Sequence, residues 1–402
     1  MQIYIIFASK QTINVMKKIK IGLLGKILIA IALGICFGLI VPEWPVRIFN
    51  TINVIFSQFL GFAIPLIILG LVTPAIADIG NKAGKMLLLT VGIAYISTVA
   101  AGLSSYFTGA LLFPSMIKPE ALTELAKVSA PEPYFSITIP PAIGVMTALV
   151  TAFMSGLCLA ATQHDVLMKA AHGFEDIVTM TIKKAIIPLL PLYIFSIFLN
   201  MTYVGEVFSI LTVFIKIIGI IFLIHIGVLV IQFTVAGIMA KKNPFRLLLT
   251  MLPAYFTALG TQSSAATIPV TLEQTKKNGV SEDIAGFTVP LCATIHMSGS
   301  MLKITACALA LMIMQGTPYD FGMFIGFICM LAITMVAAPG VPGGAIMAAL
   351  GVLNTMLGFN AEAQALMIAL YIAMDSFGTA CNVTGDGAIA IIIDRLTGNQ
   401  KK

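Results

Sequence analysis

The sequence has little charge. Asp, Glu, Lys and Arg make up 10% of its 402 residues, whereas a soluble domain carries about 25%. Hydrophobic residues account for 59%, and the mean hydropathy is +1.02. This composition predicts a polytopic membrane protein that is buried against lipid and against itself. The net charge of +6 does not indicate nucleic-acid binding, because most basic residues fall in short clusters between apolar runs, as in cytoplasmic loops.

Enzyme motifs are also missing. The sequence contains no Gly-rich phosphate loop, no nucleophile elbow and no HExxH, so we expect no enzymatic activity and no organic cofactor. The six cysteines form no CxxC pair and lie within apolar segments. We interpret them as small core residues rather than as a disulfide framework or a metal site.

Apolar runs fill the first 240 residues. They predict membrane spans at about 21–41, 50–78, 84–113, 139–162, 175–203 and 206–240. Lys17, Lys18 and Lys20 precede the first span and predict a cytoplasmic N-terminus. The later loops then alternate between the two sides, with residues 164–175 inside. Residues 1–15 are too short to span, and Met16 is a better start, so we expect an N-terminal extension that is not translated.

After residue 240 the apolar runs are shorter and interrupted. Residues 243–277 carry a polar break at 260–267 between two basic ends, which predicts a re-entrant hairpin; the alternative is a half-buried cytoplasmic loop. A span at about 284–314 is interrupted at 294–300. A second hairpin at 321–358 turns at a run of Gly and Pro. Hairpin and broken span thus occur twice, as in the inverted repeats of secondary transporters.

The last apolar segment, about 362–394, carries polar residues on one helical stripe. Spaced four, three and four positions apart, they are Asp375, Thr379, Asn382 and Asp386. A carboxylate at membrane depth costs about 2.5–3.5 kcal/mol on insertion scales, so two of them on one stripe predict an inward-facing binding face. Residues 384–387 are expected to loosen the helix and to turn carbonyl groups toward a ligand. The alternative is a polar seam between packed helices.

Motifs in this second half resemble those of one transporter family. They are Ser-Ser-x-x-Thr-x-Pro-Val-Thr at 263–271, Pro-Leu-x-Ala-Thr-Ile-x-Met at 290–297, Gly-Val-Pro-Gly-Gly at 340–344 and Asp-x-x-x-Thr-x-x-Asn-Val-Thr-Gly-Asp at 375–386. In this order they resemble the dicarboxylate/amino acid:cation symporters, which include sodium-coupled glutamate transporters and bacterial serine/threonine carriers. The resemblance runs from Met16 to the C-terminus.

The resemblance implies an all-α fold of eight transmembrane helices plus two re-entrant helical hairpins, arranged as inverted repeats. It implies a homotrimer in the bacterial cytoplasmic (inner) membrane, with both termini cytoplasmic and with lipids and a small solute, but no nucleic acid, as partners. The early segments would be scaffold helices 1–2 at 16–82, helix 3 with an external loop at 83–138, and helices 4–6 at 139–240. A transport core at 241–402 would move like an elevator and hold hairpin 1 (243–277), helix 7 (284–314), hairpin 2 (321–358) and helix 8 (362–394).

The resemblance also implies roles for site residues. Asp375 would bind a substrate amino group, and the rest of the substrate pocket would be formed by Ser263, Ser264, Ser300, Val341, Pro342, Gly343, Gly344, Thr379 and Asn382. Sodium is the implied coupling ion. Its ligands, several of them backbone carbonyls, would come from Asp386, Asn382, Cys292, His296, Thr294 and Met297. Carboxylate and carbonyl oxygens suit such a hard cation.

Departures from the family pattern bear on the cargo and on the ions. Gly378 and Gln262 stand where acidic-substrate members carry arginines. His296 and Ser298 replace an Asn and an Asp that help to build an additional sodium site. Lys303 lies on about the same helical face as His296, and a buried lysine is costly unless it is paired. Three roles are open for Lys303: a substitute for the missing cation, an anchor for a substrate anion, or a residue that snorkels to an interface.

The leading hypothesis is therefore a symporter that couples inward sodium movement to the uptake of a small, neutral amino acid. Gly378 and the compact tip at 340–344 favour that cargo. The alternatives are a carrier of dicarboxylates or acidic amino acids, and coupling to protons through His296. An ion channel is a different class of function, and it would need a continuous polar path that the sequence does not show.

Overall fold

The computed structural model describes residues 22–81, 85–117, 131–205, 207–336, 338 and 343–398. All regular elements in these residues are helical. Six stretches are long and apolar enough to cross a membrane: Glu43–Asp78, Met86–Met116, Asp165–Val204, Ile210–Ala240, Glu282–Met314 and Asp375–Thr397. The predictions for residues 1–15 and for the tip residues Val341 and Pro342 lie outside the described residues, as do Lys17, Lys18 and Lys20.

Long helices make up the first half. They are α2 (Leu23–Gly38), α3 (Glu43–Asn81), α4 (Lys85–Met116), α5 (Val145–Thr162), α6 (Asp165–Thr181), the π-helical stretch η2 (Ile182–Ile186), α7 (Ile187–Val204) and α8 (Val207–Ala240). Together they contain the six apolar runs, with α6, η2 and α7 sharing one of them, because a helix satisfies its own backbone hydrogen bonds and is therefore stable in lipid.

Two of the boundaries that differ from the predictions in this half have a clear physical cause. The span expected from residue 139 becomes helical only at Val145, because Pro140 and Pro141 disfavour helix in the residues before them. Residues 164–175, expected to be a loop, are helical from Asp165 onward. Polar and apolar residues alternate there with helical periodicity, so the segment forms a surface helix that extends the next span.

The second half contains two helix pairs, each followed by a broken helix. In order the helices are α9 (Pro244–Thr250), α10 (Leu252–Thr261), α11 (Ser264–Lys277), α12 (Glu282–Ile295), α13 (Ser298–Met314), α14 (Phe321–Met335), α15 (Gly344–Leu357), α16 (Ala361–Ala373) and α17 (Asp375–Gly398). α10 packs against α11, and α14 packs against α15. The interruptions at 262–263 and 296–297 fall inside the predicted breaks.

The last broken helix is interrupted at a different place from the one predicted. α17 runs without a break through residues 384–387, and the interruption lies at Met374, between α16 and α17. Close packing explains the continuity. Gly385 and Gly387 leave room for the side chains of His296 and Met251, which lie directly against the helix and confine it. Tertiary contacts therefore outweigh the low helix propensity of glycine.

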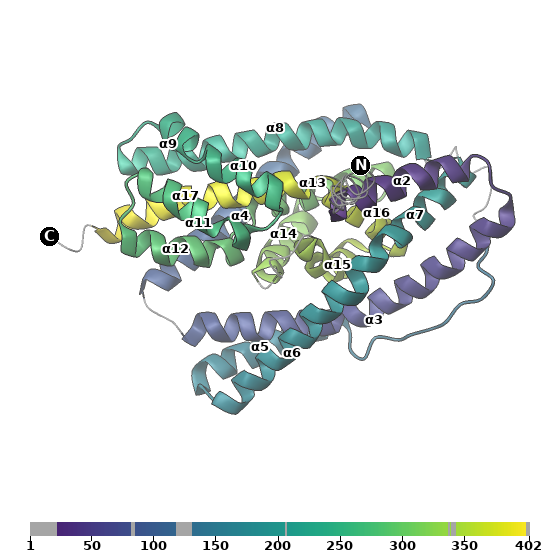
Figure 1. Ribbon diagram of the computed structural model, residues 1–402, viewed down its shortest axis with the longest axis horizontal. Coiled ribbons are helices and arrows are strands. Elements are labelled where there is room, and N and C mark those ends of the chain that lie inside the picture. The colour runs from purple at the N-terminus through teal and green to yellow at the C-terminus, as the bar shows by residue number, and fades with distance from the viewer. Residues whose placement is uncertain are drawn as a thin grey trace, which may run out of the picture.

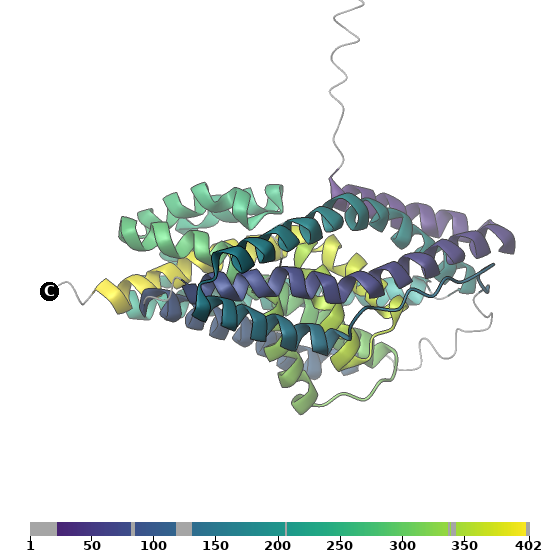
Figure 2. The same ribbon diagram turned by 90° about the horizontal axis from the view of Figure 1, so that it is seen from below.

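The helices form two groups (Figure 1). α2, α3, α5, α6 and α7 pack together along the right and lower parts of Figure 1. In the other group, α4, α8 and α10–α13 surround α17, and Figure 2 shows the yellow α17 alongside the green helices. α14, α15 and α16 lie between the groups, with α15 against α3 and α16 against α2 and α7. The breaks next to α13 and α17 are thus enclosed by protein.

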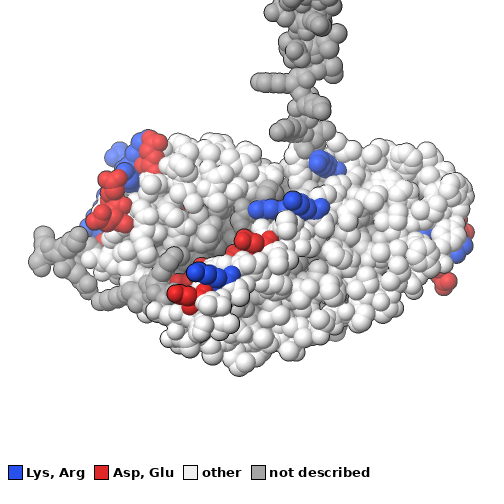
Figure 3. All heavy atoms as spheres, turned by 60° about the horizontal axis from the view of Figure 1, so that its bottom comes forward, with Lys and Arg blue, Asp and Glu red and all other residues white. Residues whose placement is uncertain are grey.

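The outer surface is apolar. Figure 3 shows a face that is mostly uncharged, with acidic and basic side chains gathered in a few separate clusters. On α8, Ile215 is 71% exposed and Leu223 is 69% exposed. Apolar side chains presented on this scale indicate a surface that lies against lipid, because monomeric soluble proteins rarely expose large apolar patches.

Candidate functional site

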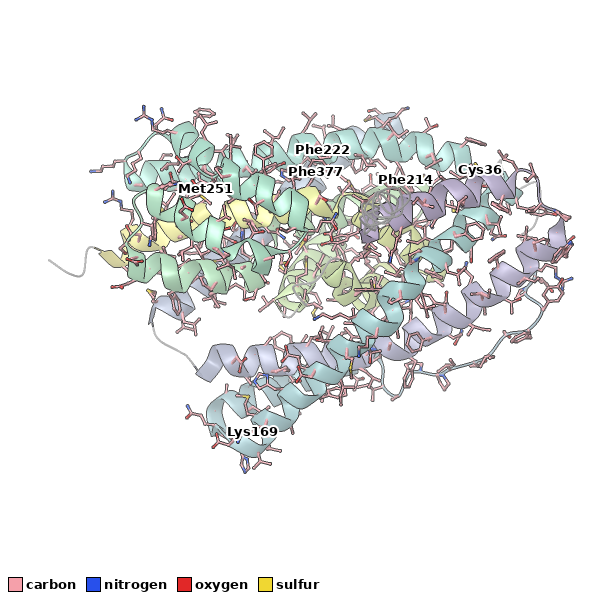
Figure 4. The ribbon with its side chains drawn as sticks, viewed as in Figure 1. Cys36, Lys169, Phe214, Phe222, Met251 and Phe377 are labelled. Atoms are coloured by element: carbon pink, nitrogen blue, oxygen red, sulfur yellow. The ribbon has the colours of Figure 1, made fainter. Side chains whose placement is uncertain are left out.

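α17 carries the predicted polar stripe into the centre of the second helix group. The stripe residues are Asp375, Thr379, Asn382 and Asp386, and all of them are buried. The helix is fixed against α8, where the rings of Phe222 and Phe377 meet edge to face with centroids 4.5 Å apart (Figure 4). A buried carboxylate is stable only if partners compensate its charge. The partners of the two aspartates come from different helix breaks.

Asp375 begins α17 directly after the break at Met374. Its Oδ2 accepts a hydrogen bond from the Gly343 N–H at 2.9 Å, and its Oδ1 lies 3.4 Å from Lys303 Nζ. Gly343 precedes α15 with φ of +77°, a left-handed conformation that favours glycine. The carboxylate therefore faces the N-terminal ends of α15 and α17, where the helix dipoles stabilise negative charge.

Lys303 on α13 reaches the same break and is only 1% exposed. Its ammonium donates to the Met374 carbonyl at 3.2 Å and lies 3.8 Å from the centre of the Tyr371 ring. That carbonyl is at the C-terminal end of α16, where positive charge is favoured. A snorkelling role is therefore wrong. Removing one partner of a buried ion pair such as Lys303–Asp375 typically costs about 3–5 kcal/mol.

The space that the Lys303 side chain occupies is left by Gly378. A Cβ at Gly378 would overlap both Nζ and Cε of Lys303. The space beside α17 at Gly378 is thus filled by a lysine that comes from another helix, α13.

Asn382 joins the middle of the stripe to the break between α12 and α13. Its Oδ1 accepts from the Gly299 N–H at 2.7 Å, and its amide group donates to Ser300 Oγ at 3.3 Å. The Ser300 hydroxyl lies 2.8 Å from the Tyr371 hydroxyl. The first N–H groups of a helix have no intrahelical partner, so Asn382 satisfies one group that the break frees.

Asp386, at the far end of the stripe, pairs with His296. Nδ1 of His296 lies 2.9 Å from Oδ1 of Asp386, with both side chains at most 1% exposed. The other ring nitrogen of His296 lies 3.2 Å from Ser97 Oγ and 3.4 Å from Gln232 Nε2. Gln232 donates to Ser97 at 2.9 Å. A chain of polar groups therefore leads from α17 through α12–α13 to α4 and α8.

The second oxygen of Asp386 suits a cation. Oδ2 is buried and has no hydrogen-bond partner among the described residues. The hydroxyls of Ser298 and Thr384 are also buried, and neither has a hydrogen-bond partner among the described residues. No group of three or more His, Cys, Asp or Glu that could hold a metal ion occurs in the described residues. The unpartnered carboxylate and hydroxyl oxygens fit a cation that prefers oxygen ligands, as sodium does.

The turn between α10 and α11 also reaches α17. Ser263 caps α11, with its Oγ accepting from the Ala266 N–H at 3.3 Å, and Ser264 is the first residue of that helix. Gln262 donates to Ser376 Oγ at 2.8 Å, one residue after Asp375. The tips of both helix pairs therefore contact the start of α17. Gln262 of the first tip bonds Ser376, and Gly343 of the second tip, next to Gly344, bonds Asp375.

Not every predicted residue points into the site. The Cys292 carbonyl accepts from the His296 N–H at 2.8 Å, and the Met297 N–H donates to Thr98 Oγ1 at 3.3 Å, so both flank the break. The hydroxyl of Thr379 donates to the Asp375 carbonyl at 3.0 Å. Thr294 is exposed and bonds the carbonyl of Leu291, so the structure does not bring its side chain to the stripe.

Four polar residues of this network were not predicted from the sequence: Ser97, Thr98, Gln232 and Tyr371. Each is a polar residue inside an apolar run. A polar side chain at membrane depth is itself a signal of a functional site. Ser97, Thr98 and Gln232 meet this criterion in other spans, and Tyr371 meets it in the segment that also carries the acidic stripe.

The sequence of this chain is similar to those of known proteins. A family model described as the sodium:dicarboxylate symporter family matches residues 23–396. Excitatory amino acid transporter 2 from Homo sapiens is 33% identical over 161 residues, and excitatory amino acid transporter 3 from Mus musculus is 34% identical over 161 residues. The aligned segment covers 40% of this chain in both cases, but only 28% and 31% of the two relatives.

Proposed function

We propose that this chain, which belongs to the sodium:dicarboxylate symporter family, is a secondary symporter. It would move a small solute together with a cation. The buried stripe of α17 carries this proposal. Asp375 meets one helix break and the tip of the α14–α15 pair, while Asp386 meets another break. Helix breaks inside a membrane protein provide backbone groups and charges for solutes and ions, as secondary transporters require.

The coupling cation in this proposal is sodium, and Asp386 is its main ligand. The unpartnered, buried Oδ2 of Asp386 supports this role. Carbonyls near the break, from Cys292, His296, Met297 and Asn382, would complete the oxygen shell. Thr294 would contribute only through its backbone, because its hydroxyl bonds Leu291.

The solute in this proposal is a small, neutral amino acid. Its amino group would bind Asp375, and the hydroxyl and amide groups of Thr379, Asn382 and Ser300 would contact its carboxylate end. The tips at Ser263–Ser264 and 341–344 would close over it. Gly378, which removes the family's arginine, favours a neutral side chain over an acidic one.

Proton coupling is a second candidate, and one observation favours it. The imidazole of His296 bonds the carboxylate of Asp386, so a proton on the ring could provide the positive charge that sodium would otherwise provide. In this alternative, protons that move down their gradient would drive solute transport through the same residues.

The larger architecture is proposed from the family. Eight transmembrane helices and two re-entrant hairpins would form a homotrimer in the bacterial inner membrane, with both termini in the cytoplasm. Helices 1–2 (16–82), helix 3 (83–138) and helices 4–6 (139–240) would contribute the scaffold and the start of the transport domain. The core at 241–402 would carry the solute across as an elevator. The packing of α2, α3, α5, α6 and α7 into a group apart from α17 supports this division.

Uptake into proteoliposomes tests the proposal. The full-length protein should accumulate radiolabelled alanine or serine when an inward sodium gradient is applied, and a proton gradient alone should not replace it. Accumulation driven only by protons would select the second candidate. Equal uptake with no gradient of either ion would contradict secondary symport.

A further inference from the structure

Lys303 and Asp375 form an isolated pair of opposite charges inside the proposed substrate site. Within the described residues, neither side chain has another charged group within salt-bridge distance. Both are nearly inaccessible, at 1% and 4% exposure. A solute that separates this pair leaves both buried charges without a partner unless it carries one charge of each sign.

The ammonium of Lys303 lies where the ammonium of a solute would bind. It contacts the carboxylate of Asp375 and the face of Tyr371, two groups that attract any organic cation. An amino acid that binds Asp375 must therefore displace Lys303. The displaced ammonium is still buried and needs an anion, and the carboxylate of the same amino acid is the nearest one available.

We propose that Lys303 is a specificity-determining residue that pairs with Asp375 when the carrier is empty and with the carboxylate of a bound zwitterion when it is loaded. This inference rests on the proposed function and adds a rule for its cargo. A zwitterion gives each member of the opened pair a new partner. An amine-free acid leaves Asp375 without a cation, and an amino amide leaves Lys303 without an anion.

The space around Gly378 makes the exchange feasible. With no Cβ there, the end of the Lys303 side chain lies directly against the α17 backbone, and no side chain at position 378 restricts it. Lys303 can then turn about its own flexible torsions between Asp375 and a ligand while α13 and α17 keep their positions.

The test compares three forms of one solute on the purified full-length protein in sodium-containing detergent buffer. Amino acids are first screened by thermal shift, and the best ligand is compared with its amide and with its amine-free acid; succinate is added as a dicarboxylate. We expect at least tenfold tighter apparent binding of the zwitterion than of either analogue or of succinate. Equal or tighter binding of the amine-free acid or of succinate overturns the inference.

Lys303→Met gives an independent arm. It should weaken binding of the amino acid at least tenfold and raise the relative affinity for its amide, because Asp375 is then free of its internal cation. Lys169→Met, at an exposed lysine of α6, is the matched control and should leave the ranking unchanged (Figure 4). An unaltered ranking in Lys303→Met also overturns the inference, and the wild-type comparison stands even if that variant does not fold.

Failure of the inference and failure of the proposed function give different results. Sodium-driven uptake of succinate or of another amine-free acid would keep the symporter and overturn the role of Lys303. Absence of sodium- or proton-driven uptake for amino acids and amine-free acids alike would contradict the symporter itself, and the inference with it.

Discussion

The two aspartates of α17 differ in how their charge is compensated. Asp375 has a lysine and a backbone N–H, whereas Asp386 has an imidazole on one oxygen and no described partner on the other. Both carboxylate oxygens of Asp375 have a partner without a bound ion, whereas one oxygen of Asp386 has none among the described residues. This difference supports the proposal that Asp375 binds the solute and Asp386 binds the cation.

Asp386→Asn should abolish stabilisation by sodium. A ligand at 100 times its Kd stabilises the folded state by about 2.7 kcal/mol, so the wild-type Tm should rise as sodium replaces choline at constant ionic strength. The Tm of Asp386→Asn should stay flat, because a neutral amide is a poor cation ligand. Asp394→Asn is the control, since Asp394 lies further along α17 and bonds Ser281 instead. A sodium-dependent rise of equal size in Asp386→Asn would refute the assignment.

Gly378→Ala should destabilise the protein through overlap with Lys303. Overpacking of a buried site typically costs about 1–3 kcal/mol, which thermal unfolding would detect as a lower Tm. The double variant Gly378→Ala/Lys303→Met should remove the overlap, so the alanine should cost less in that background. Gly92→Ala is the matched control, because a Cβ there meets no neighbour within 4 Å. Equal effects at positions 378 and 92 would show that the lysine does not fill this space.

At the scale of elements, the breaks are held in place by side chains from other helices. The break between α12 and α13 frees N–H groups, which bond Thr98 on α4 and Asn382 on α17. The break at Met374 is compensated by Lys303 on α13. Interrupted helices are stable here because neighbours replace the lost hydrogen bonds.

Thr98→Val should therefore destabilise the break. The Met297 N–H would lose its acceptor, and a buried unsatisfied donor costs about 1–3 kcal/mol. Thr90→Val is a close control, because Thr90 is also buried on α4 but bonds only the Met86 carbonyl in its own helix. Thermal unfolding of the two variants should show the larger loss for Thr98→Val. The reverse order would mean that this hydrogen bond does not support the break.

The positions of the breaks show how far the sequence determines the elements. The polar runs at 260–267 and 294–300 predicted two breaks, because small polar residues inside an apolar run can be recognised without a structure. The break at Met374 could not be read in this way, since it lies in an apolar stretch and depends on Lys303 from a distant helix. Gly385 and Gly387 led to a wrong prediction of a loosened helix. In the structure they leave space for neighbouring side chains within a continuous helix.

The same reasoning applies to the site. Periodicity was sufficient to place Asp375, Thr379, Asn382 and Asp386 on one buried stripe, because helix geometry fixes those spacings. The partners of that stripe depend on which helices pack together, and no local pattern records this. For this reason the contacts of His296 with Ser97 and Gln232 became visible only in the fold.

At the scale of the whole molecule, the two proposed binding sites are connected through one continuous helix, α17. Asp375 and Asp386 lie on opposite ends of the same buried stripe, and the α12–α13 break contacts both Asn382 and Asp386. A cation that orders this break should therefore help to order the solute site, and the reverse must hold by linkage. Such coupling is the property that distinguishes a symporter from two independent binding sites.

Calorimetry at low and at high sodium concentration is the most direct measurement of this coupling. The ligand is alanine, or the amino acid that the thermal-shift screen selects. We expect sodium to tighten binding of the amino acid at least fivefold in the wild type and the amino acid to tighten binding of sodium by the same factor. Asp386→Asn should remove both effects. Amino-acid binding with the same affinity at all sodium concentrations would contradict this coupling.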